Sequence, residues 1–329
     1  MSGPEPTAAN LPRWRGFNIV DKVSGEHQQR FPEWKFAFMA EHGFDFARIP
    51  LSYRCWATPE APLDFDEASL KEIDEAVALG ERFGIHINLN IHRAPGYCVN
   101  APAEPRNLWV DEDAIHAFAE TWGMFARRYQ GRPNAQLSFD LLNEPPDMEP
   151  GPYVRAMRAA VAAIRAQDPG RLIVVDGMKY GQDPVWDMVG DGVAQSTRGY
   201  LPMEISHYEA TWVPHIKEWS MPSWPMQVGD KLRDYAWMTG KFKDFRAIHA
   251  QGVGVHVGEW GCYRFTPHAV ALAWMEDNLR NWKEWGWGWA LWNLKGTFGI
   301  IDSGRADVAY EDTPFGPLDR AMLELLKRY

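Results

Sequence analysis

The chain alternates between short apolar runs and longer amphipathic stretches along most of its length. The apolar runs, which are rich in β-branched and aromatic residues, are typical of strands. They predict strands at residues 15–20, 44–50, 85–92, 135–144, 171–177, 201–208, 252–260 and 286–293. The amphipathic stretches predict helices at residues 31–42, 66–83, 112–130, 151–167, 237–250, 267–285 and 317–328, with a shorter helical piece at 184–189.

Regular alternation of strands and helices predicts βα units and a parallel sheet. Eight such units within 329 residues fit a closed (β/α)8 barrel, the TIM barrel, better than an open sheet. No interdomain linker or low-complexity segment interrupts the pattern. We therefore expect an α/β fold with a single domain over residues 1–329 and a short N-terminal extension at residues 1–13.

The third predicted strand has polar residues on one of its two faces. Because side chains alternate along a strand, Ile87, Leu89 and Ile91 share one face. Asn88, Asn90 and His92 share the other face. A barrel accommodates this pattern because the apolar face packs against the outer helices while the polar face points inward.

Composition narrows the class of protein. Hydrophobic residues make up 46% and charged residues 24%, a globular balance, and the net charge of −10 argues against a nucleic-acid partner. No apolar run is long enough to predict a membrane span. The start of the chain, MSGPEPTAANLPRW, has neither a basic segment nor an apolar core. The sequence thus shows no signal peptide, and we expect a cytoplasmic protein or a secreted one whose leader has been removed.

Seventeen tryptophans are more than a core requires, so we expect many of them to line a surface or a cleft. Three cysteines, Cys55, Cys98 and Cys262, lie far apart, and free thiols are the favoured interpretation over one disulfide.

In a (β/α)8 barrel the active site lies at the C-terminal ends of the strands. The predicted strands bring polar and aromatic side chains to this rim. These residues are Asn18, Arg48, His92, Asn143, Glu144, His207, Tyr208, Glu259 and Trp292.

Two of these residues, Glu144 and Glu259, end the fourth and seventh predicted strands. A pair of carboxyl groups that flank one bond is the apparatus of glycoside hydrolysis. The alternative for either residue alone is a strand-end carboxylate in a salt bridge. Asp140 shares the strand face of Glu144 but lies deeper, where pairing with Arg48 is the expected role.

Other chemistries have weaker support. The chain has no H-x-H or H-E-x-x-H pattern, so a metal held by His92, His207 and a carboxylate is a minor alternative. It also has no glycine-rich phosphate-binding motif. We expect neither a metal nor a cofactor.

Several segments together resemble glycoside hydrolase family five, the cellulase and mannanase family of retaining (β/α)8 glycosidases. The segments span nearly the whole chain in strand order. They are RGFN (15–18), ARIP (47–50), NIHRAPG (90–96), LLNEP (141–145), SHY (206–208), GEWG (258–261) and ALWNLKGTFGIID (290–302).

The resemblance implies double displacement, with Glu144 as the general acid/base and Glu259 as the nucleophile, their carboxyl groups about 5–5.5 Å apart. It implies that Arg48 keeps Glu259 ionised and that Asn143 holds the sugar 2-hydroxyl. His92, His207 and Trp292 would surround the attacked sugar. A cis peptide bond after Trp292 is expected as well.

Two departures accompany the resemblance. Strand alternation would turn Asn143 away from the face of Glu144, so both reach the site only if the strand kinks or bulges. The family's sixth strand often reads His-x-Tyr, with the tyrosine near the nucleophile. Here Tyr208 directly follows His207, so either Tyr208 takes this role in a shifted register or the tyrosine is missing.

The expected substrate is a β-linked glucan or oligosaccharide. A β-mannanase or β-mannosidase, or an exo-acting β-glucosidase, would use the same chemistry, and a non-catalytic carbohydrate-binding barrel is the alternative from another class. Aromatic rings stack on sugar rings, and we expect Trp109 or Trp212 to contact the substrate. Oligomeric state is not indicated.

Overall fold

Eight parallel strands form a closed barrel, which confirms the predicted (β/α)8 fold. The computed structural model describes residues 5–25, 29–214 and 216–329. Each barrel strand pairs in parallel with two neighbours, and the pairing of β2 with both β1 and β3 closes the ring. The barrel strands are β1 (Arg15–Asn18), β2 (Phe46–Ser52), β3 (His86–Ala94), β5 (Leu137–Asp140), β6 (Ile173–Asp176), β7 (Ala194–Gly199), β10 (Val255–Trp260) and β11 (Gly288–Leu291).

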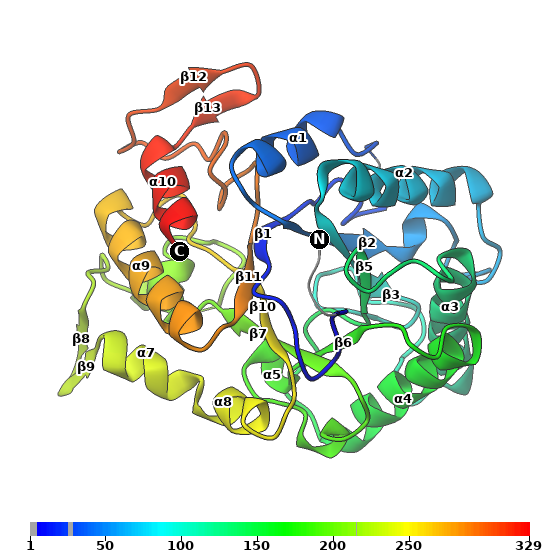
Figure 1. The fold of residues 1–329 in the computed structure, drawn as a ribbon. Coiled ribbons are helices and arrows are strands. Elements are labelled where there is room, and N and C mark those ends of the chain that lie inside the picture. Colours follow the sequence, from blue (N-terminus) through cyan, green and yellow to red (C-terminus); the bar gives the residue numbers. More distant parts are fainter. Residues whose placement is uncertain (1–4, 26–28, 215) are drawn as a thin grey trace.

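Helices surround the barrel (Figure 1). They are α1 (Glu33–Glu41), α2 (Glu67–Phe83), α3 (Glu112–Arg128), α4 (Pro150–Gln167), α5 (Met178–Gly181), α6 (Met203–Ser206), α7 (Tyr235–Lys241), α8 (Lys243–His249), α9 (His268–Glu284) and α10 (Arg320–Arg328). Within the described part of the chain, none of the helices has the length and apolar character needed to cross a membrane.

Short elements decorate the loops. Strand β4 (Tyr97–Cys98) pairs antiparallel with the end of β3. Two hairpins lie outside the barrel, β8 (Met226–Val228) with β9 (Lys231–Arg233), and β12 (Glu311–Thr313) with β13 (Gly316–Leu318). Single 3-10 turns occur at η1 (Tyr53–Cys55), η2 (Trp186–Met188) and η3 (Ile216–Glu218).

The third strand has the two faces that its sequence predicts. Ile87, Leu89 and Ile91 belong to the main hydrophobic core, which lies between the barrel and the helices. Asn88 faces the barrel interior, where its side chain donates a hydrogen bond to Ser138 Oγ. The core is therefore a shell around the barrel, and the barrel interior is free to carry polar groups.

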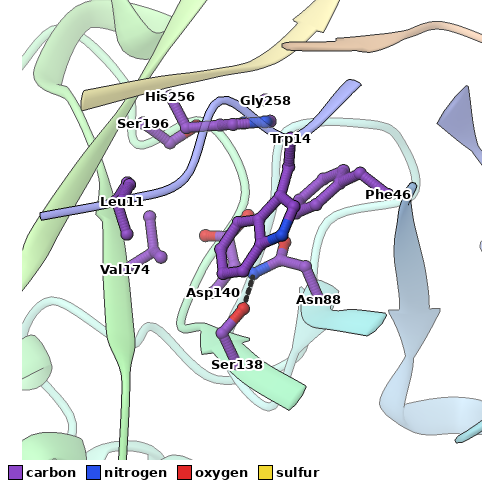
Figure 2. Close-up of a pocket in the computed structure, with 10 residues that line it drawn as sticks. All are labelled: Leu11, Trp14, Phe46, Asn88, Ser138, Asp140, Val174, Ser196, His256 and Gly258. Atoms are coloured by element: carbon purple, nitrogen blue, oxygen red, sulfur yellow. Dashed lines mark hydrogen bonds between the residues drawn. The ribbon is translucent and has the colours of Figure 1, made fainter. Parts of the chain in front are cut away.

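The segment that precedes β1 covers the end of the barrel at which the strands begin. Leu11 and Trp14 line a small interior cavity of about 10 Å³ together with polar side chains of the strands (Figure 2). The ring of Trp14 stacks on His86 at a centroid distance of 3.7 Å. A cavity of this size holds at most about one water molecule. This end of the barrel therefore has no room for a larger ligand.

The sixth barrel strand does not lie where the sequence predicts it. The strand predicted at 201–208 is wrong, because the sixth barrel strand is β7 (Ala194–Gly199) and residues 203–206 form the short helix α6 after Pro202. Strand β7 reads AQSTRG, and all six residues are buried although most are polar. Hydrogen bonds replace apolar contacts there, since the side chain of Gln195 bonds both the N–H and the C=O of Val185.

Nine of the seventeen tryptophans are half-buried or exposed, which agrees with the expectation that many line a surface or a cleft. The other eight are buried, and three of these form one packed group in which Trp260 contacts Trp282 at 4.8 Å and Trp289 at 5.5 Å between ring centroids. The buried tryptophans are Trp14, Trp56, Trp122, Trp260, Trp274, Trp282, Trp287 and Trp289. The three cysteines are free thiols.

Candidate active site

A cleft of about 430 Å³ opens at the C-terminal ends of the barrel strands. This volume lies in the range of small-molecule binding sites. Six of its lining residues lie on the barrel strands or shortly after their ends. His92, Arg198 and Glu259 belong to β3, β7 and β10. Tyr200 and Trp292 directly follow β7 and β11, and Glu144 lies four residues after the end of β5. The fold thus gathers on one rim side chains that are up to 200 positions apart in the chain, from His92 to Trp292.

Glu259 at the end of β10 is held by a fully buried arginine. Arg48 Nη1 donates to Glu259 Oε1 at 2.5 Å, while Arg48 Nε contacts Asp140 Oδ2 at 2.7 Å. The pairing of Asp140 with Arg48 is as the sequence predicts. Tyr200 donates its hydroxyl to the other oxygen of Glu259, Oε2, at 3.2 Å. Charge-assisted hydrogen bonds of this kind fix the direction in which the carboxylate points.

The backbone turns out of strand geometry where Glu144 enters the cleft. Glu144 has φ +50°, a left-handed conformation that costs about 1–3 kcal/mol for a residue with a side chain. Two side chains fix this turn, because Asp176 Oδ2 accepts from Glu144 N–H at 2.9 Å and Tyr97 donates to Glu144 C=O at 2.6 Å. The turn is the kink that Asn143 and Glu144 need in order to reach the same site.

The carboxyl group of Glu144 contacts a second arginine. Arg198 Nε donates to Glu144 Oε1 at 2.9 Å. Burial, and next the negative charge of Glu259, raise the pKa of Glu144 to about 7, although Arg198 opposes both. A carboxyl group with this pKa both gives and takes a proton near neutral pH.

Asn143 lies between the two arginines. Its Oδ1 accepts from Arg48 Nη2 at 3.0 Å and from Arg198 Nη2 at 2.8 Å. This arrangement fixes the orientation of the amide. Its Nδ2 is buried and has no hydrogen-bond partner among the described residues. The amide therefore keeps its donor group available for a ligand.

Aromatic side chains form the walls of the cleft. His92 and Trp292 lie nearly parallel, with ring centroids 5.6 Å apart, and the predicted cis bond after Trp292 is present. His207 and Trp212 line the opposite part of the cleft with Phe298. Burial lowers the pKa of His92 to about 3 and that of His207 to about 4, so both rings are neutral at physiological pH.

Four predicted residues do not line this cleft. Two of them, Arg48 and Asn143, are fully buried and contact cleft residues, Arg48 through Glu259 and Asn143 through Arg198.

The other two are Tyr208 and Trp109. Tyr208 follows α6, and Tyr200 is the tyrosine that contacts Glu259. The prediction of Tyr208 is wrong because the predicted sixth strand begins seven residues after β7 does. Trp109 packs against Tyr97 at 4.7 Å between ring centroids.

Four residues of the site were not predicted from the sequence. They are Tyr97, Asp176, Arg198 and Tyr200. A signal for two of them exists in the sequence. Arg198-Gly199-Tyr200 has the spacing of the family's His-x-Tyr, with arginine in place of histidine. No local signal marks Tyr97 or Asp176, because both act on the backbone of a residue far away in sequence.

A (β/α)8 barrel with two glutamates facing one aromatic-walled cleft at its C-terminal mouth is the architecture of a barrel glycosidase. The model of the cellulase family, glycosyl hydrolase family 5, matches residues 13–297, and the chain belongs to this family. The protein is therefore a glycoside hydrolase, and retention of anomeric configuration is general in this family.

Known proteins resemble the chain over nearly its whole length. Endoglucanase C of Acetivibrio thermocellus is 23% identical over 330 residues, which cover 92% of this chain and 95% of that protein. A solved structure described as a glycoside hydrolase is 36% identical, with a TM-score of 0.91 over 96% of this chain and 99% of that one. Endoglucanase Cel5A of Thermotoga maritima is 23% identical, with a TM-score of 0.76 over 95% and 96% of the two chains. Further structures of that endoglucanase contain cellobiose and mannotriose.

Proposed function

We propose that the protein hydrolyses β-linked glucans and their oligosaccharides, with Glu144 as the general acid/base and Glu259 as the nucleophile. One observation carries this proposal: both carboxyl groups line the same cleft, and different side chains surround each of them. Glu144 has its pKa raised to about 7, whereas Glu259 accepts hydrogen bonds from Arg48 and Tyr200. Paired carboxyl groups in unlike environments are the pattern of an acid and a nucleophile.

In the first step, a carboxylate oxygen of Glu259 forms a bond to the anomeric carbon. The bond from this carbon to the leaving oxygen breaks, its electron pair stays on that oxygen, and the oxygen takes the proton of Glu144. In the second step, ionised Glu144 takes a proton from water while the water oxygen bonds to the anomeric carbon. The bond to Glu259 breaks, and its electron pair returns Glu259 to a carboxylate.

Other residues of the site would bind the sugar. The free donor of Asn143 is suited to the 2-hydroxyl, where hydrogen bonds strengthen in the transition state. Trp292, beside His92, offers an apolar face to the sugar ring, and Trp212 and His207 line the same cleft. Endoglucanases among the relatives favour glucan as the polymer.

The proposal is tested with two variants and two substrates. Glu259→Gln should abolish turnover of both cellotetraose and 2,4-dinitrophenyl β-cellobioside, because the nucleophile is lost. Glu144→Gln should abolish turnover of cellotetraose but still release dinitrophenol in a first burst, since this leaving group needs no proton. General acid catalysis contributes about 10²–10⁴-fold, which sets the size of the expected difference.

Glu81→Gln is the matched control, because Glu81 is an exposed glutamate of α2 that pairs with Arg132 far from the cleft. Proton NMR of the products should show the β-anomer first. Mannotetraose, assayed in parallel, identifies the preferred epimer. If the wild-type protein cleaves none of these substrates or other β-glucans, yet binds them as tightly as both variants do, the proposed function is wrong and the barrel is a carbohydrate-binding protein.

A further inference from the structure

Arg198 contacts both proposed catalytic carboxyl groups from inside the barrel. Its side chain is only 2% exposed. Nε lies 2.9 Å from Glu144 Oε1, and Nη2 lies 3.8 Å from Glu259 Oε1. The guanidinium also contacts both carboxylate oxygens of Asp176, and Nη2 donates to Asn143 Oδ1. The cation therefore sits at the centre of the charged network, with no side-chain nitrogen left for a ligand.

The fold leaves room for this long side chain at two glycines. A Cβ atom at Gly258 would lie 2.9 Å from Arg198 Nη1 and 2.4 Å from Ser196 Oγ. A Cβ atom at Gly181 would lie 2.6 Å from Arg198 Cγ. All three distances are too short for real contacts. Gly258 directly precedes Glu259, so the backbone that presents one carboxylate is shaped around the arginine that contacts the other.

The arginine also replaces a different kind of residue. The resemblance to the family implies His-x-Tyr at the end of the sixth strand, and this chain has Arg198-Gly199-Tyr200. A buried histidine is neutral at physiological pH, as His92 and His207 are, whereas an arginine remains charged. Burial opposes the charge of Arg198, but Asp176, Glu259 and Glu144 raise its pKa above the ordinary value. The site therefore carries a permanent positive charge next to Glu144.

We propose that Arg198 is a positioning residue that acts through Glu144, holding its carboxyl group in the cleft and assisting the step in which this group must be ionised. The inference rests on the proposed function, because it takes Glu144 to be the acid/base. In the second step Glu144 removes a proton from water, and the water oxygen displaces Glu259 from the anomeric carbon. A neighbouring cation favours the ionised Glu144 that this step requires. The same cation opposes the protonated Glu144 that the first step requires.

The pH dependence of both steps follows from the groups around Glu144. Arg198 is the cation in contact with its carboxyl group, and Glu259 and Asp176 act against it with negative charge. Other titratable groups face the same region from neighbouring elements. They are Tyr97, Tyr180, Tyr200, His92 and His207. An opposite charge at this distance typically lowers the pKa of a carboxyl group by about 1–3 pH units. Removing Arg198 should therefore raise the pKa of Glu144, so that its carboxyl group stays protonated to a higher pH.

The test is the pH profile of Arg198→Gln on two substrates. With cellotetraose, the alkaline limb of kcat/KM reports loss of the proton that the first step needs. With 2,4-dinitrophenyl β-cellobioside, the acid limb of kcat reports the ionised base that the second step needs. Both limbs should move to higher pH by about 1–3 pH units. At a pH below the shifted acid limb, kcat on the dinitrophenyl substrate should fall at least about tenfold.

Two measurements separate this role from structural damage. Azide attacks the glycosyl-enzyme without a general base, so it should restore turnover of the dinitrophenyl substrate by Arg198→Gln and give a glycosyl azide. Arg198→Lys keeps the charge, so its limbs should lie between those of Arg198→Gln and the wild type. Arg171→Gln removes another buried arginine, which binds the first residue of β5 at the end of the barrel where the strands begin. This variant should shift neither limb of the pH profile.

Arg198→Gln leaves Asp176 without its nearest cation, although Arg48 remains 3.8 Å away. If this variant does not fold, the double variant Arg198→Gln/Asp176→Asn is measured instead and is compared with Asp176→Asn alone, so that the difference between the two reports the loss of Arg198. The role of Arg198 would be overturned if an active variant kept both limbs of its pH profile at the wild-type pH. It would also be overturned if azide did not raise turnover of the dinitrophenyl substrate. Either result would leave the proposed function unaffected. A wild-type protein that cleaves no β-glycoside would overturn both.

Discussion

Arg48→Met is expected to lower both the stability of the protein and its activity. Arg48 is fully buried and makes charge-assisted hydrogen bonds to Asp140 at 2.7 Å and to Glu259 at 2.5 Å, two side chains that are 1% and 5% exposed. It also donates to Asn18 at 3.1 Å and to Asn143 at 3.0 Å. Methionine fills a similar volume but offers none of these donors. The substitution therefore leaves two buried carboxylates without their main cation.

Removing one partner of a buried ion pair typically costs about 3–5 kcal/mol. For a chain of 329 residues, an unfolding entropy of about 2.1 cal/mol/K per residue converts each kcal/mol into about 1.5 °C. Differential scanning calorimetry should therefore show the unfolding midpoint falling by about 4–7 °C. Because the carboxylate of Glu259 is no longer held, kcat/KM on cellotetraose should fall by about 10² or more.

The matched control for Arg48 is Arg171→Met. Arg171 is 3% exposed and binds Asp168 at 2.7 Å and the carbonyl of Leu137 at 2.9 Å, far from the cleft. This variant should lose stability to a similar extent and keep its activity. A midpoint for Arg48→Met within about 2 °C of the wild type would show that the buried carboxylates do not depend on this cation. Equal activity of the two variants would refute the role of Arg48 in holding Glu259.

Three further predictions follow from the site. The proposed first step requires a protonated Glu144, whose pKa is raised to about 7, so kcat/KM on cellotetraose should fall as the pH rises through about 7. Tyr200→Phe removes a donor to Glu259, the proposed nucleophile, and should lower kcat/KM about tenfold or more, whereas Tyr208→Phe should lose far less; equal losses would contradict the assignment. Gly258→Ala should cost about 1–3 kcal/mol in thermal unfolding, because its Cβ meets Ser196 at 2.4 Å. Gly151→Ala on α4, with nothing within 4 Å, should not destabilise.

The sequence predicted the structure best where the alternation of side chains along a strand also decides which of them face the core. The alternation of β3 predicted which side chains face the core and which face the barrel interior, because a barrel separates an apolar outside from a polar inside. The same reasoning placed Asp140 beside Arg48, which the structure confirms at 2.7 Å. Strand ends that carry polar groups then located the cleft, since the fold gathers these ends on one rim.

The sixth strand shows where this reasoning stops. Strand β7 is buried but polar, so its burial depends on hydrogen-bond partners such as Val185 that sequence periodicity does not reveal. The apolar run at 201–208 had the stronger strand pattern, yet Pro202 begins the short helix α6 there. Misplacing one strand hid Arg198 and Tyr200 together. The sequence also did not predict which eight tryptophans are buried, because ring contacts such as those of Trp260 arise between distant segments.

The hydrogen bond from Tyr97 to the carbonyl of Glu144 joins the loop after β3 to the proposed proton donor. Tyr97 belongs to the loop that follows β3, and nearby Val99 and Asn100 of this loop line the cleft. Exchanging the loop to admit a different sugar polymer would therefore also release the backbone that aims the proposed proton donor. A redesigned loop should therefore keep Tyr97. Without this tyrosine, a change in substrate preference is expected to come with a slower reaction.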